Sequence, residues 1–227
     1  MTIQTLAQQK EAILLLMNYA VPTEHMDEAR QLLDRHQTDT IAMNLLNAFY
    51  SYLPEGLDDC VRELRLLTRR KGAFLLAAVT HNSTYVYLAT AENAEFLGDL
   101  KDGIWDVEIR DFFELGSRES FLKKTAEINE FPVHAPIHQD EQLCPICAAA
   151  NGEEHILGCP VEVCPWCSGQ LTSCHCRFEQ LDRDSLLGDH ELASLEKKLQ
   201  NKGRIPYDST QHRPTYPATD EREGVTN

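Results

Sequence analysis

Cysteine is concentrated in one short segment of this chain. Seven of the eight cysteines lie between Cys144 and Cys176, in 33 residues that also contain His155 and His175. Thiolate and imidazole groups are the usual ligands of structural zinc, which binds four of them in a tetrahedron. Metal binding can supply the folding free energy of a module with a small apolar core. This segment therefore constrains the fold more strongly than any other feature.

The candidate ligands fall into two sets of four. Each set begins with a Cys-x2-Cys pair, at Cys144 and at Cys164, and continues with a second pair of donors. Ligand pairs two to four residues apart are typical of zinc sites, so two zinc ions per chain are predicted. The predicted ligands are Cys144, Cys147, His155 and Cys159 for the first ion and Cys164, Cys167, Cys174 and Cys176 for the second.

Two alternatives to this assignment stay open. An interleaved ribbon fits as well, because 16 residues separate Cys147 from Cys164 and a spacing of about 15–20 residues is common between such pairs. His175 can also replace Cys174 or Cys176 as a ligand. We favour ligation in chain order, because each set then closes a short loop with neighbouring ligands.

The two Cys-Pro-x-Cys sequences, CPIC and CPWC, resemble the knuckles of zinc-ribbon modules. Ala148 and Ser168 stand where such knuckles usually have glycine, and Gly169 follows one position late, so a shift in turn geometry is expected. The order of a hairpin, FLGDLKDGIW, the double cysteine cluster and GRIPY is also similar to uncharacterised bacterial zinc-ribbon proteins. This resemblance implies metal binding and carries no particular activity.

Other uses of clustered cysteines fit less well. Disulfides would leave seven cysteines unevenly paired in a chain without a secretion signal. CPWC also resembles the CPYC site of glutaredoxins, but such a site needs a βαβ context, and here further ligands surround it. A catalytic zinc keeps one coordination position open, whereas both sets here have four donors.

Nucleic-acid binding through the cysteine segment is not expected. No Lys or Arg lies between Cys144 and Cys176, while Glu153, Glu154 and Glu162 do. Seven thiolates around two divalent ions leave the sites themselves negative, and the chain has a net charge of -15. A phosphate backbone would be repelled by this surface.

The first third of the chain is predicted to be helical. Helices are expected over residues 6–20, from a cap at Thr23 to His36, and over residues 40–53 with Thr38 or Asp39 as the cap and Pro54 as the stop. A fourth helix is predicted over residues 57–72, with Cys60 buried on its apolar side. Its basic last turn would complement the helix dipole; the basic residues are Arg62, Arg65, Arg69, Arg70 and Lys71.

The pattern then changes to strands and shorter elements. AFLLAAV and TYVYLAT, rich in β-branched, aromatic and aliphatic residues, predict a β-hairpin around residues 81–83. Residues 103–115 fit a strand or a helix, and Ser117 begins a predicted helix. Pro132 and Pro136 indicate a linker, which argues against metal binding by the His134/His138 pair. Residues 189–203 predict a helix with Asp189 as its cap, Leu192, Leu195 and Leu199 on one face, and Gly203 at its end.

These patterns together predict an α+β protein. The N-terminal domain, residues 1–131, contains helices and a hairpin or small antiparallel sheet; residues 132–143 are the linker and 144–180 the double zinc module. Residues 181–206 contain the C-terminal helix, and the polar tail, 207–227, is expected to be disordered. A signal peptide and an apolar run long enough to span a bilayer are both missing, so a cytoplasmic location without membrane contact is expected.

A non-catalytic interaction or adaptor role with protein partners fits this sequence best. No Ser-His-Asp set, phosphate-binding loop or nucleotide fingerprint is visible. The first alternative is nucleic-acid binding or transcription-linked regulation through the basic helix end near Arg69. The second is an enzyme with a site around the hairpin and Trp105. Trp166, between two ligands, would either cover the metal site or serve as an exposed anchor for a partner.

Overall fold

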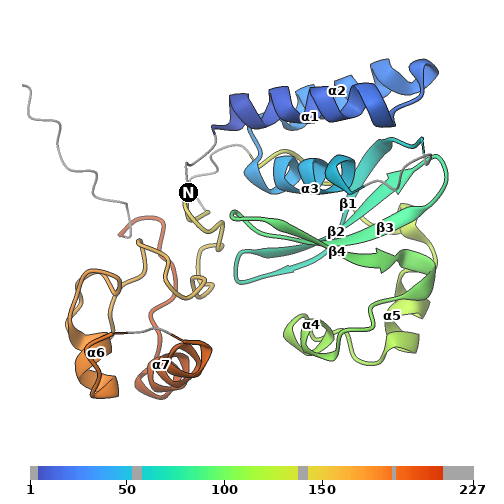
Figure 1. Ribbon diagram of the computed structural model, residues 1–227. Helices are drawn as coiled ribbons and strands as arrows, with labels where there is room; N and C mark the ends of the chain where they lie inside the picture. The colour runs from blue at the N-terminus through green and yellow to red at the C-terminus, as the bar shows by residue number, and fades with distance from the viewer. Residues whose placement is uncertain (1–4, 53–57, 138–142, 186–187, 212–227) are drawn as a thin grey trace, which may run out of the picture.

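The computed structural model describes residues 5–52, 58–137, 143–185 and 188–211 and has the predicted α+β class (Figure 1). Three helices precede an antiparallel sheet of four strands, and the cysteine segment follows with two further helices. The N-terminal elements are α1 (Leu6–Ala20), α2 (Met26–His36), α3 (Thr40–Ser51), β1 (Val61–Arg70), β2 (Ala73–Thr80), β3 (Thr84–Ala89), β4 (Ala94–Asp99), α4 (Val107–Phe112) and α5 (Arg118–Lys124). The later helices are α6 (Cys176–Leu181) and α7 (Asp189–Lys202).

Side-chain caps fix the starts of the first helices. Thr5 and Gln8 form a capping box at α1. Asp39 caps α3, because its Oδ1 accepts hydrogen bonds from the backbone N–H groups of Ile41 and Ala42. The 3-10 turn Thr23–His25 leads into α2, so Thr23 lies within this turn and not at the cap of α2, which ends at His36 as predicted.

The helix predicted over residues 57–72 is wrong, since residues 61–70 form strand β1. Its pairing with β2 is interrupted by register shifts between Val61 and Glu63 and between Leu66 and Thr68. A β-bulge adds one residue to a strand and breaks its alternation. Buried Val61 and Leu64 are therefore three residues apart on one face, the spacing that suggested a helix. Cys60, just before β1, is buried as predicted.

The basic run at the end of β1 leads into a hairpin turn and not into a helix terminus. Lys71 and Gly72 have φ values of 48° and 76°, and both positive values match the type I′ turn that suits a two-residue hairpin. A Cβ at Gly72 would collide with the carbonyl oxygen of Cys147. The β1–β2 turn thus lies directly against the first cysteine pair.

The sheet separates two apolar cores. Its order is β1-β2-β3-β4, which includes the predicted hairpin of residues 73–90 as β2 and β3. On one face Phe74 and Leu76 pack with α1–α3. On the other face Leu75 and Val86 pack with the region of α4 and α5, where Phe121 is buried (Figure 1). The segment that fitted a strand or a helix contains α4, capped by Asp106, and Ser117 caps α5.

Residues 132–137, the first half of the predicted linker, extend the sheet at the edge of β1. The N–H of Leu66 donates to the carbonyl of Pro132 at 2.9 Å, and the N–H of His134 donates to the carbonyl of Leu64 at 2.8 Å. The His134 side chain is buried. This half is therefore part of the N-terminal fold, while His138 and the rest of residues 138–142 lie outside the described residues.

The C-terminal helix and the residues after it pack on the cysteine segment. In α7, Leu195 and Leu199 are buried but Leu192 is exposed; Gly188 is the N-cap in place of Asp189, and Gly203 ends the helix. The predicted disordered tail begins at residue 207, yet Tyr207 is buried and its hydroxyl donates to the carbonyl of Leu143. Residues 212–227 lie outside the described residues. Among the described helices, none is long and apolar enough to cross a bilayer.

Candidate metal centres

The two Cys-x2-Cys pairs lie on the same backbone turn, repeated 20 residues apart. In the first turn, the N–H of Cys144 donates to the carbonyl of Ala149 at 2.8 Å, and the N–H of Ala148 donates back to the carbonyl of Cys144 at 2.9 Å. In the second turn the equivalent bonds join Cys164 with Gly169 at 2.7 Å and Ser168 with Cys164 at 2.8 Å. The sequence showed the paired cysteines but not this repeated geometry.

Both turns contain a left-handed residue that is not glycine. Ala148 has a φ of 57° and Ser168 a φ of 62°, at the positions where glycine was expected. A left-handed conformation costs about 1–2 kcal/mol for a residue with a Cβ. The expected shift to Gly169 does not occur, since Ser168 itself adopts the positive φ. The two backbone hydrogen bonds that close each turn hold the residue in this conformation.

The first four donors converge in a buried group. The donor atoms of Cys144, Cys147, His155 and Cys159 all lie within 4.8 Å of one another. The two sulfurs of Cys144 and Cys159 are 3.8 Å apart, and Cys147 Sγ lies 3.3 Å from His155 Nδ1. Zinc–sulfur bonds of about 2.3 Å at tetrahedral angles require a sulfur–sulfur distance of about 3.8 Å. The group therefore has the dimensions of a zinc site.

The second four donors form a separate and more exposed group. Cys164 is buried, Cys174 and Cys176 are half-buried, and Cys167 is exposed, with all four donor atoms within 4.8 Å of one another. The eight predicted ligands thus gather in chain order, and neither group mixes the two sets. His175 lies at the N-cap of α6, outside the second group.

The thiols of the first group cannot all be charged in the absence of a cation. Hydrogen bonds with Cys147 and Cys159 lower the pKa of Cys144 to about 3. The same neighbourhood, mainly the bonds with Cys144 and Cys147, raises the pKa of Cys159 far above its usual range. One thiolate is therefore stabilised at the expense of the next, a conflict that a divalent ion removes because it stabilises every bound thiolate.

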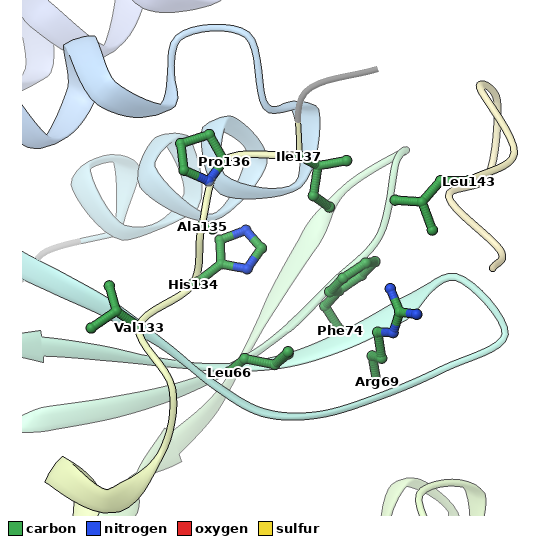
Figure 2. Close-up of a pocket in the computed structure, with 9 residues that line it drawn as sticks. All are labelled: Leu66, Arg69, Phe74, Val133, His134, Ala135, Pro136, Ile137 and Leu143. Atoms are coloured by element: carbon green, nitrogen blue, oxygen red, sulfur yellow. The ribbon is translucent and has the colours of Figure 1, made fainter. Parts of the chain in front are cut away.

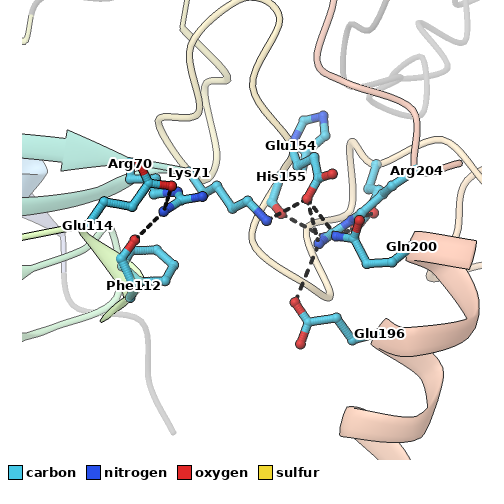
Figure 3. A network of polar contacts seen from close by, with 10 residues as sticks. Arg70, Lys71, Phe112, Glu114, Glu154, His155, Glu196, Gln200 and Arg204 are labelled. Atoms are coloured by element: carbon cyan, nitrogen blue, oxygen red, sulfur yellow. Dashed lines mark hydrogen bonds and ion pairs between the residues drawn. The ribbon is translucent and has the colours of Figure 1, made fainter. Parts of the chain in front are cut away.

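A network of polar contacts around Arg204 adjoins the His155 loop of the first group (Figure 3). The Arg204 guanidinium bonds to Glu162 at 2.6 Å and 3.0 Å and donates to the carbonyl of His155 at 2.7 Å. Arg204 and Glu162 are 8% and 0% exposed. Glu154, 3.7 Å from Arg204, also pairs with Lys71 of the β1–β2 turn at 2.6 Å. The network therefore links the ligand loop to both α7 and the sheet.

Tyr207 covers the first group. Its ring meets that of His155 edge to face at a centroid distance of 5.3 Å. Its backbone bonds on both sides to the ligand loop, with Gly152 N–H donating to its carbonyl and its own N–H donating to the carbonyl of Glu153, both at 2.8 Å. Sequence analysis missed Arg204, Glu162 and Tyr207. The only signal in the sequence was GRIPY, which contains Arg204 and Tyr207. It is one of the segments that resemble bacterial zinc-ribbon proteins.

Trp166 packs over the second group. The half-buried indole lies against a small cluster in which Leu171 and the α7 residues Leu195 and Leu199 are buried together with Cys164. Of the two roles considered for Trp166, this position favours a cover that limits the access of water over that of a free anchor.

The basic residues near Arg69 lie on β1 and its turn, so their expected role at a helix terminus is wrong. Four of them pair with acidic residues at 3.2 Å or less: Arg62 with Glu28, Arg65 with Glu63, Arg70 with Glu114 and Lys71 with Glu154. These pairs neutralise most of the charge on which the nucleic-acid alternative depends.

Arg69 lies instead beside a cavity of about 510 Å³ under residues 133–137 (Figure 2). The cavity wall is mainly apolar, with the rings of Phe74 and His134 on it and Arg69 at its side. No sequence motif predicted this cavity, because its walls come from the sheet and from the segment that was interpreted as a linker.

Neither a scan against protein-family models nor searches of curated proteins and of solved structures returned a match for this chain. The function is therefore argued from the geometry of the chain itself.

Proposed function

We propose that this chain is a zinc protein with two structural sites, and that the zinc-stabilised module is part of a non-catalytic adaptor. The observation that carries the proposal is the pair of four-donor groups, one of which has the sulfur–sulfur distance of 3.8 Å that tetrahedral zinc requires. Four protein donors at each ion leave no coordination position for a substrate. The paired knuckles also support kinship with zinc-ribbon modules.

Zinc content tests the metal half of this proposal. Protein purified without added metal is expected to release two zinc ions per chain when a mercurial reagent modifies its thiols. Cys167→Ser should lower the released zinc to one ion per chain, because it removes a donor of the second group. Cys60→Ala, which changes the cysteine outside both groups, should leave it at two. Release of one ion from the unaltered chain would contradict the scheme, as would visible absorption from bound iron.

An exposed aromatic surface supports the adaptor half. Trp105 is 67% exposed, Val107 57% and Phe112 39%, all within or just before α4. Arg118 lies over the Trp105 ring at 3.8 Å, which holds the indole in place as a preformed contact residue. Aromatic residues with adjacent arginine are typical of the residues that dominate binding energy at protein interfaces.

Capture from the native cell extract tests this surface. The unaltered protein is expected to retain a defined protein partner that Trp105→Ser with Val107→Ser loses. Tyr19→Ser is the control, because Tyr19 is 81% exposed on α1, away from α4. Equal capture by all three proteins would contradict a role for this surface, and capture of nucleic acid would favour the alternative function.

A further inference from the structure

A third cluster of metal-binding side chains lies inside the N-terminal fold, far along the chain from the cysteines. His36 ends α2, Asp39 caps α3, and His134 lies in the segment that pairs with β1. Their relative exposures are 1%, 1% and 4%. One donor atom from each residue lies within 4.8 Å of the other two.

The two distances from Asp39 to the histidines bracket the spacing of ligands around one ion. Asp39 Oδ2 lies 2.8 Å from His134 Nε2 and 3.6 Å from His36 Nδ1. Donors bound at about 2.0–2.2 Å to a common zinc ion lie about 3.3–3.5 Å apart at tetrahedral angles, between these two values. The contact with His36 is too long for a hydrogen bond. Among the described residues His36 Nδ1 has no hydrogen-bond partner, although it is buried.

The charge of the Asp39 carboxylate and its orientation also favour a bound cation. The Asp39 carboxylate is buried without a Lys or Arg partner among the described residues, and the N–H of Ile137 also donates to its Oδ2 at 3.2 Å. Backbone N–H groups carry no net charge, so a cation at Oδ2 would balance the carboxylate. Its Oδ1 is held by the N–H groups of Ile41 and Ala42, which directs Oδ2 toward the two imidazoles. Carboxylates that bind metals are usually held in place by hydrogen bonds of this kind.

We propose that His36, Asp39 and His134 bind a third divalent ion, of the borderline class that imidazole and carboxylate prefer, such as Zn²⁺. The ion would join α2, α3 and the edge segment 132–137, and so fasten the chain that leads toward the cysteine module. The rival is a proton on one histidine, which would balance Asp39 without any metal. A bound ion would add one metal ion to each chain, whereas a protonated histidine would add none.

The test compares the metal content of the full chain with that of two glutamine variants after dialysis against excess Zn²⁺ and then metal-free buffer. In His134→Gln the amide can still donate to Asp39, but a neutral amide is a poor ligand for zinc. This variant is expected to hold one zinc ion fewer per chain than the unaltered protein. His190→Gln, an equivalent change at an exposed position on α7, should lose none. Equal zinc content in all three proteins would overturn the proposal.

Cobalt separates this site from the cysteine groups. In Co²⁺-loaded protein, His134→Gln and a second variant, His36→Gln, should lose one ion while the thiolate-to-cobalt charge-transfer absorption stays unchanged, because no cysteine belongs to this cluster. Loss of that absorption together with the ion would mean that the variants act by unfolding, which would also overturn the proposal. A third outcome is possible, in which the unaltered protein lacks the charge-transfer absorption and His134→Gln still binds one ion fewer. That result would support the third site and contradict the cysteine sites.

Discussion

Removal of zinc is expected to unfold residues 143–211 while the sheet and α1–α5 remain folded. The two clusters in the cysteine module are small and include the cysteines themselves, with Val161, Leu171, Leu195 and Leu199 among the few large apolar residues. The N-terminal cores are much larger and contain no proposed zinc-binding cysteine. Structural zinc contributes about 10–16 kcal/mol in small peptides, more than such clusters supply. Amide hydrogen exchange with and without a chelator measures the effect.

The structure sharpens this expectation at α7. Leu195 and Leu199 are buried in one cluster with Cys164 of the second cysteine group, so amide protection in α7 should be lost together with that of Cys164–Cys176. Cys174→Ser should have the same effect on α7 in the presence of zinc. Amides of β2, buried between both cores, serve as the internal control and should keep their protection. Unchanged exchange across residues 143–181 after zinc removal would refute a structural role for the metal.

The second large effect is expected at the buried ion pair. Arg204→Met should destabilise the module by about 3–5 kcal/mol, the usual cost of leaving one partner of a buried pair without the other. Glu162 is 0% exposed and would lose the cation that balances its carboxylate, while the carbonyl of His155 would lose its donor. Chemical denaturation, with amide exchange in the module as the probe, measures the free energy of unfolding of the module. Arg183→Met, at an exposed position, is the matched control.

A double variant and pH test the cause of this effect. Glu162→Leu added to Arg204→Met should recover part of the loss, because it removes the unpaired carboxylate. Burial raises the pKa of Glu162, although Arg204 opposes the shift. Without Arg204 the folded state binds a proton that the unfolded state releases, so the stability of Arg204→Met should fall as pH rises above the unfolded pKa of Glu162. A loss under about 1 kcal/mol in the single variant would contradict these expectations.

Local spacing predicted the cysteine groups well, because each closes within a short stretch of chain. Cys144 and Cys159 are only 15 positions apart, and the Cys-x2-Cys signature specifies their chemistry. Helices α1 and α3, and the β2–β3 hairpin, were also recognised from local caps and alternation. Strand β1 was not, because its bulges place Val61 and Leu64 at a helical spacing.

The remaining features depend on contacts that one sequence does not encode locally. His134 meets Asp39 across 95 positions, and Arg204 meets Glu162 across 42. Residues 132–137 were interpreted as part of a linker for a related reason. The prolines at positions 132 and 136 exclude a helix correctly, but they do not exclude an edge segment that pairs through the carbonyl of Pro132 and the N–H of His134.

The position of Tyr207 has a consequence for how the module matures on the ribosome. All eight cysteine and histidine donors of the two groups have been synthesised once Cys176 is added, whereas Arg204 and Tyr207 come later. Both groups can therefore collect their ions from the cell while the first is still uncovered. The later emergence of Arg204 and Tyr207 then places a salt bridge and an aromatic ring beside the first group. For the proposed zinc protein, the order of the chain would thus separate the binding of metal in time from the covering of the first site.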